Sequence, residues 1–192
     1  MRRRQFIAGL GSSAAWPVVA GAQQPAVPVV GFLSSQSADD DYKNFTFSFL
    51  QGLKESGYIE GQNVAVEYRF AENQFDRLPA LAADLVRRRV AVIVANGVVE
   101  ALAAKAATTT IPIVFSSGVD PVALGLVASL NRPGANVTGT ANLGGELAPK
   151  QLQLLRELLP NAAVFGVLAD PAFPGIKSNV EDLQAAARTL GL

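Results

Sequence analysis

The amino-acid sequence predicts an α/β fold, a doubly wound parallel sheet with helices on both faces. Short apolar runs alternate along the chain with segments that repeat apolar residues at helical spacing. One run, VAVIVA at 90–95, is apolar over its whole length, which is typical of a strand covered on both faces. Strand–helix–strand order favours parallel pairing, because the helix carries the chain back before the next strand begins.

Bulk composition narrows the function classes. The 192 residues are 49% hydrophobic and 17% charged, which suffices for a core, and a formal net charge of zero predicts no nucleic-acid partner. Cys and His are both absent, which removes disulfides, thiolate chemistry, the commonest general base and the commonest zinc ligand. We therefore expect no enzyme, no metal and no cofactor, with carboxylate- or lysine-based chemistry as the open alternative.

Residues 1–22 fit an export signal. Arginines at 2–4 precede a modestly apolar stretch over 8–20, and Ala20-Gly21-Ala22 fits a cleavage site. The apolar part is shorter than the roughly 20 residues that span a bilayer, so no membrane insertion is expected after cleavage. The arginines with Phe6-Ile7 resemble a twin-arginine signal; an ordinary Sec signal and a buried N-terminal helix are the alternatives.

The next segments alternate as the fold class requires. PVVGFL at 28–33 indicates a buried strand, and aspartates at 39–41 favour the start of a helix that ends at Gly57. QNVAVEYRF at 62–70 alternates apolar and polar residues, as a half-buried strand does. Residues 78–86 carry the clearest helical periodicity in the chain.

Three arginines at 87–89 suit the negative end of that helix, and we interpret them as complementing its dipole rather than as a nucleic-acid patch. The rest of the chain continues the alternation. Further strands are predicted at 90–95, 113–115 and 164–169, and further helices at 98–107, 120–131, 144–159 and 176–190.

Small polar residues follow three of the predicted strands. Parallel strands end at one edge of a sheet, where ligands bind in open α/β folds, and the helix N-termini that follow suit a carboxylate. Hydroxyl and amide groups can fix a ligand's orientation. The candidate residues are Ser34, Ser35, Asn96, Gly97, Ser116 and Ser117, with Asp120 as an acceptor for a ligand ammonium and Tyr42 as an aromatic platform.

Each candidate has a structural alternative. Ser34 and Ser35 would also start a turn into the first helix. Asp120 before Pro121 fits a helix N-cap, and Tyr42 fits a surface helix position. The three aspartates at 39–41 are interpreted as a solvated helix start and not as a metal site, because consecutive residues do not face one another on a helix.

The run at 111–139, IPIVFSSGVDPVALGLVASLNRPGANVTG, resembles a family of bacterial substrate-binding proteins of ABC-type importers, whose better-known members take up aromatic amino acids. Further matches extend the resemblance from the end of the signal to Gly191. The matching motifs include Gly52-Leu53-Lys54, Glu60-Gly61-Gln62-Asn63-Val64, Asp120-Pro121-Val122, Gly125-Leu126-Val127, Asn136-Val137-Thr138-Gly139 and Leu158-Leu159-Pro160.

The resemblance implies a type I periplasmic-binding-protein-like fold, a periplasmic location, and a small solute held between two lobes and passed to a membrane permease. It places Val98 at the site beside the residues already named. One departure concerns 96–99, where many relatives have Thr, small residues and Pro instead of Asn-Gly-Val-Val. Asn96 is polar, as is the Thr of those relatives, but its different identity leaves the chemical class of the ligand open.

The resemblance also divides the chain. We expect a complete amino-terminal lobe over 23–142 and an incomplete second lobe over 143–192, poorly stabilised because a lone strand leaves both edges and its helices' apolar faces uncovered. The leading hypothesis is the solute-binding component of an ABC-type importer, truncated here, with an amino acid as solute. A sensory module of the same fold, a non-binding fragment and an enzyme on a doubly wound sheet are the alternatives.

Overall fold

The structure is a computed structural model that describes residues 27–142, 147–171 and 176–192. The predicted export signal therefore lies outside the described residues. Within these three ranges, no helix has the length and apolar character needed to cross a membrane.

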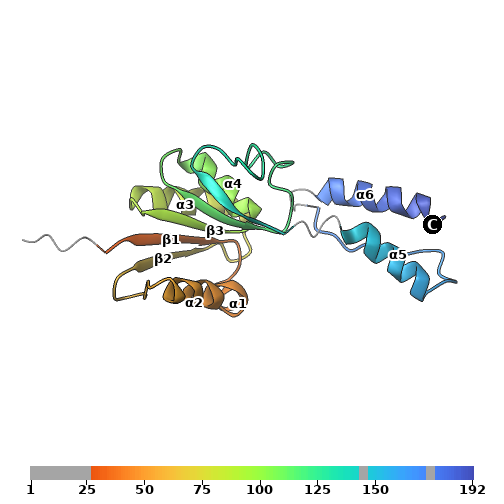
Figure 1. Cartoon of the computed structure of the whole chain (residues 1–192), viewed down its shortest axis with the longest axis horizontal. Helices are drawn as coiled ribbons and strands as arrows, with labels where there is room; N and C mark the ends of the chain where they lie inside the picture. The colour runs from red at the N-terminus through yellow and green to blue at the C-terminus, as the bar shows by residue number, and fades with distance from the viewer. Residues whose placement is uncertain (1–26, 143–146, 172–175) are drawn as a thin grey trace, which may run out of the picture.

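Five parallel strands form one sheet in the order β2-β1-β3-β4-β5 (Figure 1), which confirms the predicted parallel sheet. The first strand lies inside the sheet, hydrogen-bonded on one side to β2 and on the other to β3. The strands are β1 Val29–Ser34, β2 Ala65–Phe70, β3 Val92–Asn96, β4 Ile113–Ser117 and β5 Val137–Ala141.

Helices cover both faces, as a doubly wound sheet requires. Figure 1 shows α1 and α2 on one side of β1 and β2, and α3 and α4 on the other side of the sheet. Ser37 begins the first helical segment, because its hydroxyl accepts from the Asp40 N–H and donates to the Asp40 carboxylate. The helical segments are α1 Ala38–Asp41, the π-helical η1 Tyr42–Thr46, α2 Phe47–Glu55, the 3₁₀ turn η2 Phe75–Arg77, α3 Leu78–Arg87 and α4 Val98–Ala107.

The two faces of β1 pack differently. Leu33 points into the larger aliphatic core with α3 and α4, where Leu85 and Ile93 are fully buried. Phe32, one residue earlier, points to the opposite face and is also fully buried. Its ring lies 5.4 Å from that of Phe49 and 5.6 Å from that of Tyr68, so an aromatic cluster joins α2 to β1 and β2.

The prediction of a helix over 120–131 was wrong. The backbone makes a single turn after Asp120, and Gly125 then adopts a φ of +67°, in the left-handed region that ends a right-handed helix. Leu126 and Val127 follow at once and are buried in the aliphatic core. The chain continues into β5, which the sequence did not predict because VTGTA lacks an apolar run.

The strand predicted at 164–169 is also absent from the described residues, where this segment has no regular secondary structure and no ladder partner. Leu168 is fully exposed and Val164 is 86% exposed. An isolated strand has no neighbour to satisfy its backbone groups or cover its faces, which is the physical reason for the failed prediction.

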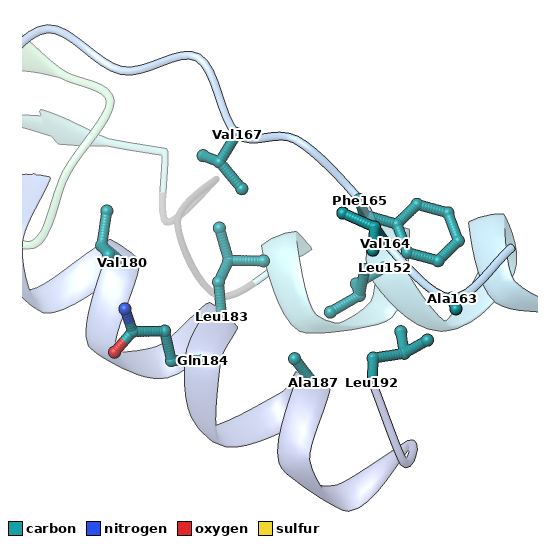
Figure 2. A pocket seen from close by; sticks show the side chains of 10 residues that line it. All are labelled: Leu152, Ala163, Val164, Phe165, Val167, Val180, Leu183, Gln184, Ala187 and Leu192. Atoms are coloured by element: carbon teal, nitrogen blue, oxygen red, sulfur yellow. The ribbon is translucent and has the colours of Figure 1, made fainter.

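The flanking helices do form, as α5 Ala148–Leu158 and α6 Ile176–Thr189. They pack side by side, beyond the carboxyl ends of the strands (Figure 1). An apolar hollow of about 430 Å³ lies between them, and Figure 2 shows the side chains of Leu152 and Leu183 that line it. Leu158 in contrast is 75% exposed, so the pair has apolar surface on its outside as well.

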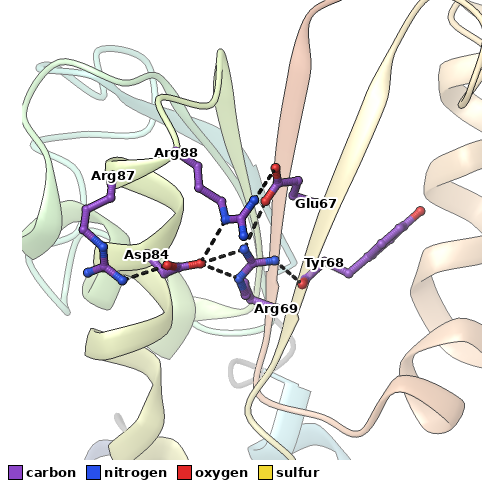
Figure 3. A network of polar contacts seen from close by, with 6 residues as sticks. All are labelled: Glu67, Tyr68, Arg69, Asp84, Arg87 and Arg88. Atoms are coloured by element: carbon purple, nitrogen blue, oxygen red, sulfur yellow. Dashed lines mark hydrogen bonds and ion pairs between the residues drawn. The ribbon is translucent and has the colours of Figure 1, made fainter.

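An ion-pair network ties β2 to α3 (Figure 3). Arg69 donates to Asp84 at 2.6 and 2.9 Å and to Glu67 at 3.0 Å, and Arg87 and Arg88 complete the network. Two of the arginines predicted to complement the helix dipole thus pair with carboxylates. The hydrogen bond from Arg69 is the main reason that the pKa of the Asp84 carboxyl lies below its ordinary value.

We expect Phe32→Ala to lower the free energy of unfolding by about 3–5 kcal/mol, because it opens a cavity in the aromatic cluster. Leu158→Ala is the matched control, since that side chain is already largely in solvent and its removal should cost less than about 0.5 kcal/mol. Urea denaturation of both variants measures the difference. Equal losses would show that the first strand is not the centre of the fold.

We expect Asp84→Asn to lower the free energy of unfolding at neutral pH. The difference from the wild type should become smaller as the pH is lowered. A carboxyl with a lowered folded pKa stabilises the protein above its unfolded pKa of about 3.9 and loses that contribution as pH falls through the folded value. Denaturation at pH 7, 5, 4 and 3 tests this, with Asp76→Asn as an exposed control. A gap that does not change with pH would contradict it.

Candidate functional site

The register of the sheet brings the predicted strand ends together. Leu33 pairs with Ala95, so that Ser34 lies beside Asn96, and Asn96 itself pairs with Ser116. Adjacent strands are about 4.8 Å apart, so these three residues lie in a row across β1, β3 and β4. The predicted convergence of polar residues at one sheet edge is confirmed; we call this row with its following loops the strand-tip site.

Two serine hydroxyls at the strand-tip site hold the loops in shape. Ser34 is fully buried and its Oγ accepts from the Gln36 N–H at 3.2 Å. Ser117 is almost as buried; its Oγ donates to the Val119 carbonyl at 2.8 Å and accepts from the Val119 N–H. Ser35, Asn96 and Ser116 are only partly buried, so among the predicted serine and asparagine residues these three have surface that a solute can reach.

Asp120 caps the turn that follows β4. Its Oδ1 accepts from the Val122 N–H at 2.8 Å and from the Ala123 N–H at 3.3 Å, which is the capping geometry considered as the alternative. The carboxylate is nonetheless exposed. Val98 contributes its side chain to the aliphatic core, which leaves its backbone for any contact with a solute. The side chain of Tyr42 lies outside the described residues.

A buried carboxylate that the sequence reading missed lies beneath the site. Glu100 is 1% exposed, and its Oε1 accepts from the Ser35 N–H at 2.7 Å, across 65 residues of sequence. It occupies the third position of α4, where a glutamate often turns back toward the helix start. That spacing after Asn96-Gly97 was the signal that could have revealed it.

Gly97 makes this arrangement possible. Its φ of +135° is open to glycine only, and a Cβ there would overlap the Glu100 carboxylate. The first N–H groups of α4, a helix of ten residues, begin directly after it, and such groups carry partial positive charge. Glu100 therefore fixes the loop after β1 against the start of α4.

Gln36 is a second residue that sequence reasoning missed, and no pattern marked it. Its Oε1 is buried and accepts no hydrogen bond from the described residues. Its backbone carbonyl accepts from the Glu72 N–H at 3.2 Å, which ties the loop after β1 to the loop after β2.

Taken together, the strand-tip site offers hydroxyl, amide and backbone N–H groups on a rigid edge. Such groups bind and orient a small polar molecule through hydrogen bonds. Within the described part of the chain, no cluster of three or more potential ligands could hold a metal ion.

The comparisons with known proteins agree with this geometry. The family model for ABC transporter substrate binding proteins matches residues 26–192. The tyrosine-binding protein of Clostridioides difficile strain R20291 is 33% identical over 140 residues, which cover 73% of this chain and 40% of that protein.

Two solved structures extend the comparison. A conserved domain protein from Vibrio cholerae superposes with a TM-score of 0.78 at 31% identity, and an ABC domain from Streptococcus pneumoniae in complex with L-Trp with a TM-score of 0.73 at 27% identity. Each covers 86% of this chain and 55% of the solved chain. The chain thus spans little more than half the length of these relatives.

We expect Glu100→Ala to lower the free energy of unfolding by about 2–3 kcal/mol, because it leaves the Ser35 N–H without its acceptor. Glu100→Gln keeps an acceptor oxygen at the same distance from the backbone, so this variant should lose clearly less free energy of unfolding. Urea denaturation gives the stabilities, and hydrogen exchange at the Ser35 amide reports the contact itself. Unchanged exchange in the alanine variant would contradict the assigned role.

Proposed function

The chain belongs to the family of ABC transporter substrate-binding proteins, and from this we propose that it supplies one wall of a cleft that captures an amino acid for an ABC-type importer. The observation that carries the proposal is the pairing of Asn96 with Ser116 at one sheet edge, beside the N-terminus of α4, with Ser35 directly after the end of the neighbouring β1. A substrate-binding protein performs no chemistry, and these residues offer hydrogen-bonding groups without a histidine or cysteine.

The strand-tip site suits the polar end of an amino acid. Backbone N–H groups at the start of α4 favour a carboxylate, and the exposed carboxylate of Asp120 suits an ammonium group. The relatives support the same class, since one is named for tyrosine and another was solved with L-Trp. We therefore propose an amino acid as solute, with aromatic ones as the first to test.

We also propose that residues 143–192 belong to a second lobe. The relatives are nearly twice as long as the matched region, and α5 and α6 present apolar faces of the kind that a sheet covers. A good site buries 70–90% of its ligand, which takes two walls. Capture between two lobes, an exported and periplasmic location, and delivery to a membrane permease complete the proposed role.

The test is a titration of the chain with L-Trp, L-Tyr and L-Leu, in which binding is monitored through the chemical shifts of the backbone amides. Saturable shifts are expected at 34–36, 96–98 and 116–118. Asn96→Ala should weaken binding about tenfold, since it removes hydrogen bonds to the solute. Asn179→Ala, on α6, is the matched control and should change nothing.

Saturable shifts that appear elsewhere, or binding that Asn96→Ala leaves unchanged, would overturn the proposed site. If none of the three amino acids shifts the strand-tip amides at millimolar concentration, the chain alone is not an amino-acid-binding wall.

A further inference from the structure

A second hollow lies between β2 and the helices that cover it; it borders the strand-tip site at Phe70, which pairs with Ser34, and extends from there toward Glu60. Its volume is about 470 Å³, within the range of small-molecule sites. We call it the β2 hollow. It is lined chiefly by Asp39, Thr46, Leu50, Glu60, Tyr68 and Phe70.

One wall of the β2 hollow is aromatic. Tyr68 and Phe70 alternate on the same face of β2, and their rings are stacked with centroids 5.9 Å apart and an interplanar angle of 6°. Phe32 supports the Tyr68 ring at 5.6 Å and is itself fully buried. The two rings are therefore held in place by the core while they line an open space, which makes them a preformed stacking surface.

The rim of the β2 hollow is acidic. Asp39 and Glu60 are both exposed, and Glu60 accepts one hydrogen bond from the Tyr68 hydroxyl at 3.2 Å. No lysine or arginine is among the described residues that line the hollow, and Arg69, between Tyr68 and Phe70 on β2, pairs with Glu67 and Asp84 instead. Neither of these two carboxylates belongs to the ion-pair network around Glu67 and Asp84.

We propose that the β2 hollow is a second ligand site, which binds an organic cation that carries an ammonium or guanidinium group on an apolar body. Aromatic faces attract cations and stack on apolar groups, and the two carboxylates supply the opposite charge at the rim. Leu50 adds an apolar surface for the body of the ligand. An anion of the same shape would meet repulsion from both carboxylates.

This site differs in chemistry from the strand-tip site. The strand-tip site is built from hydroxyl, amide and backbone N–H groups and is suited to a carboxylate at the start of α4. The β2 hollow offers two carboxylates and two rings, which favour a ligand without a carboxylate. The proposal therefore stands independently of the proposed solute-binding function.

The probe is 2-phenylethylammonium, with phenylacetate as a control of similar size and opposite charge. Amide chemical shifts of the full chain are followed during each titration. We expect saturable shifts at 38–50 and 60–70 with the cation and none with the anion. Glu60→Gln and Asp39→Asn should each weaken binding about fivefold, which corresponds to an exposed charge pair.

Two controls locate the binding. Asp76→Asn removes an exposed carboxylate that does not line the hollow and should leave the affinity unchanged. Asn96→Ala alters the strand-tip site and should also leave it unchanged. Because both rim residues are exposed, their variants are expected to fold, and the dispersion of the amide spectrum verifies this.

The proposal is overturned by any of three results. These are no saturable shift at 10-fold excess over about 1 mM protein, equal binding of phenylacetate, or cation binding that Asn96→Ala abolishes and Glu60→Gln does not. The last result would assign the cation to the strand-tip site.

Discussion

Burial of β1 on both faces and both edges is the constraint on which the rest of the structure depends. Its residues alternate between two cores, with Leu33 directed to α3 and α4 and Phe32 to α2. Hydrogen bonds to β2 and β3 then fix the register of the neighbouring strands. Because a slip of one residue would exchange the two faces, packing in the cores determines where each strand ends.

The position of the strand-tip site follows from that register. Ser34, Asn96 and Ser116 need no contacts with one another to lie in a row, since the ladders place them there. What the ladders do not fix is the path of the loop after β1. Glu100 supplies that restraint from a distant segment, and glycine at position 97 leaves room for its carboxylate.

Much of this architecture could be predicted from the sequence, for reasons that can be named. Helices such as Leu78–Arg87 have strong 3.6-residue periodicity, and strands such as Val92–Asn96 are apolar up to their last residue, so local pattern and tertiary burial agree. The convergence of the polar residues at the strand tips could also be predicted, because parallel strands end at one edge of a sheet. Gln36 was missed because its partner is a backbone group of another loop, which no local pattern shows. The spacing of Glu100 after Asn96-Gly97 marks the start of a helix, but it does not name the distant Ser35 N–H from which Glu100 accepts.

The wrong predictions at 120–131 and 164–169 have the same cause. In each segment the local sequence fits the predicted element, but the tertiary contacts that the element needs are absent from the described residues. At 120–131 the apolar residues recur at helical spacing. The left-handed turn at Gly125 nevertheless ends the helical turn, and Leu126 and Val127 pack into the core from the segment that follows. At 164–169 the short apolar run has the composition of a strand but no ladder partner among the described residues. A strand forms only where a neighbouring strand accepts and donates its backbone hydrogen bonds. A helix makes these hydrogen bonds within itself, so α5 and α6 form on either side of the segment in sequence although the strand does not.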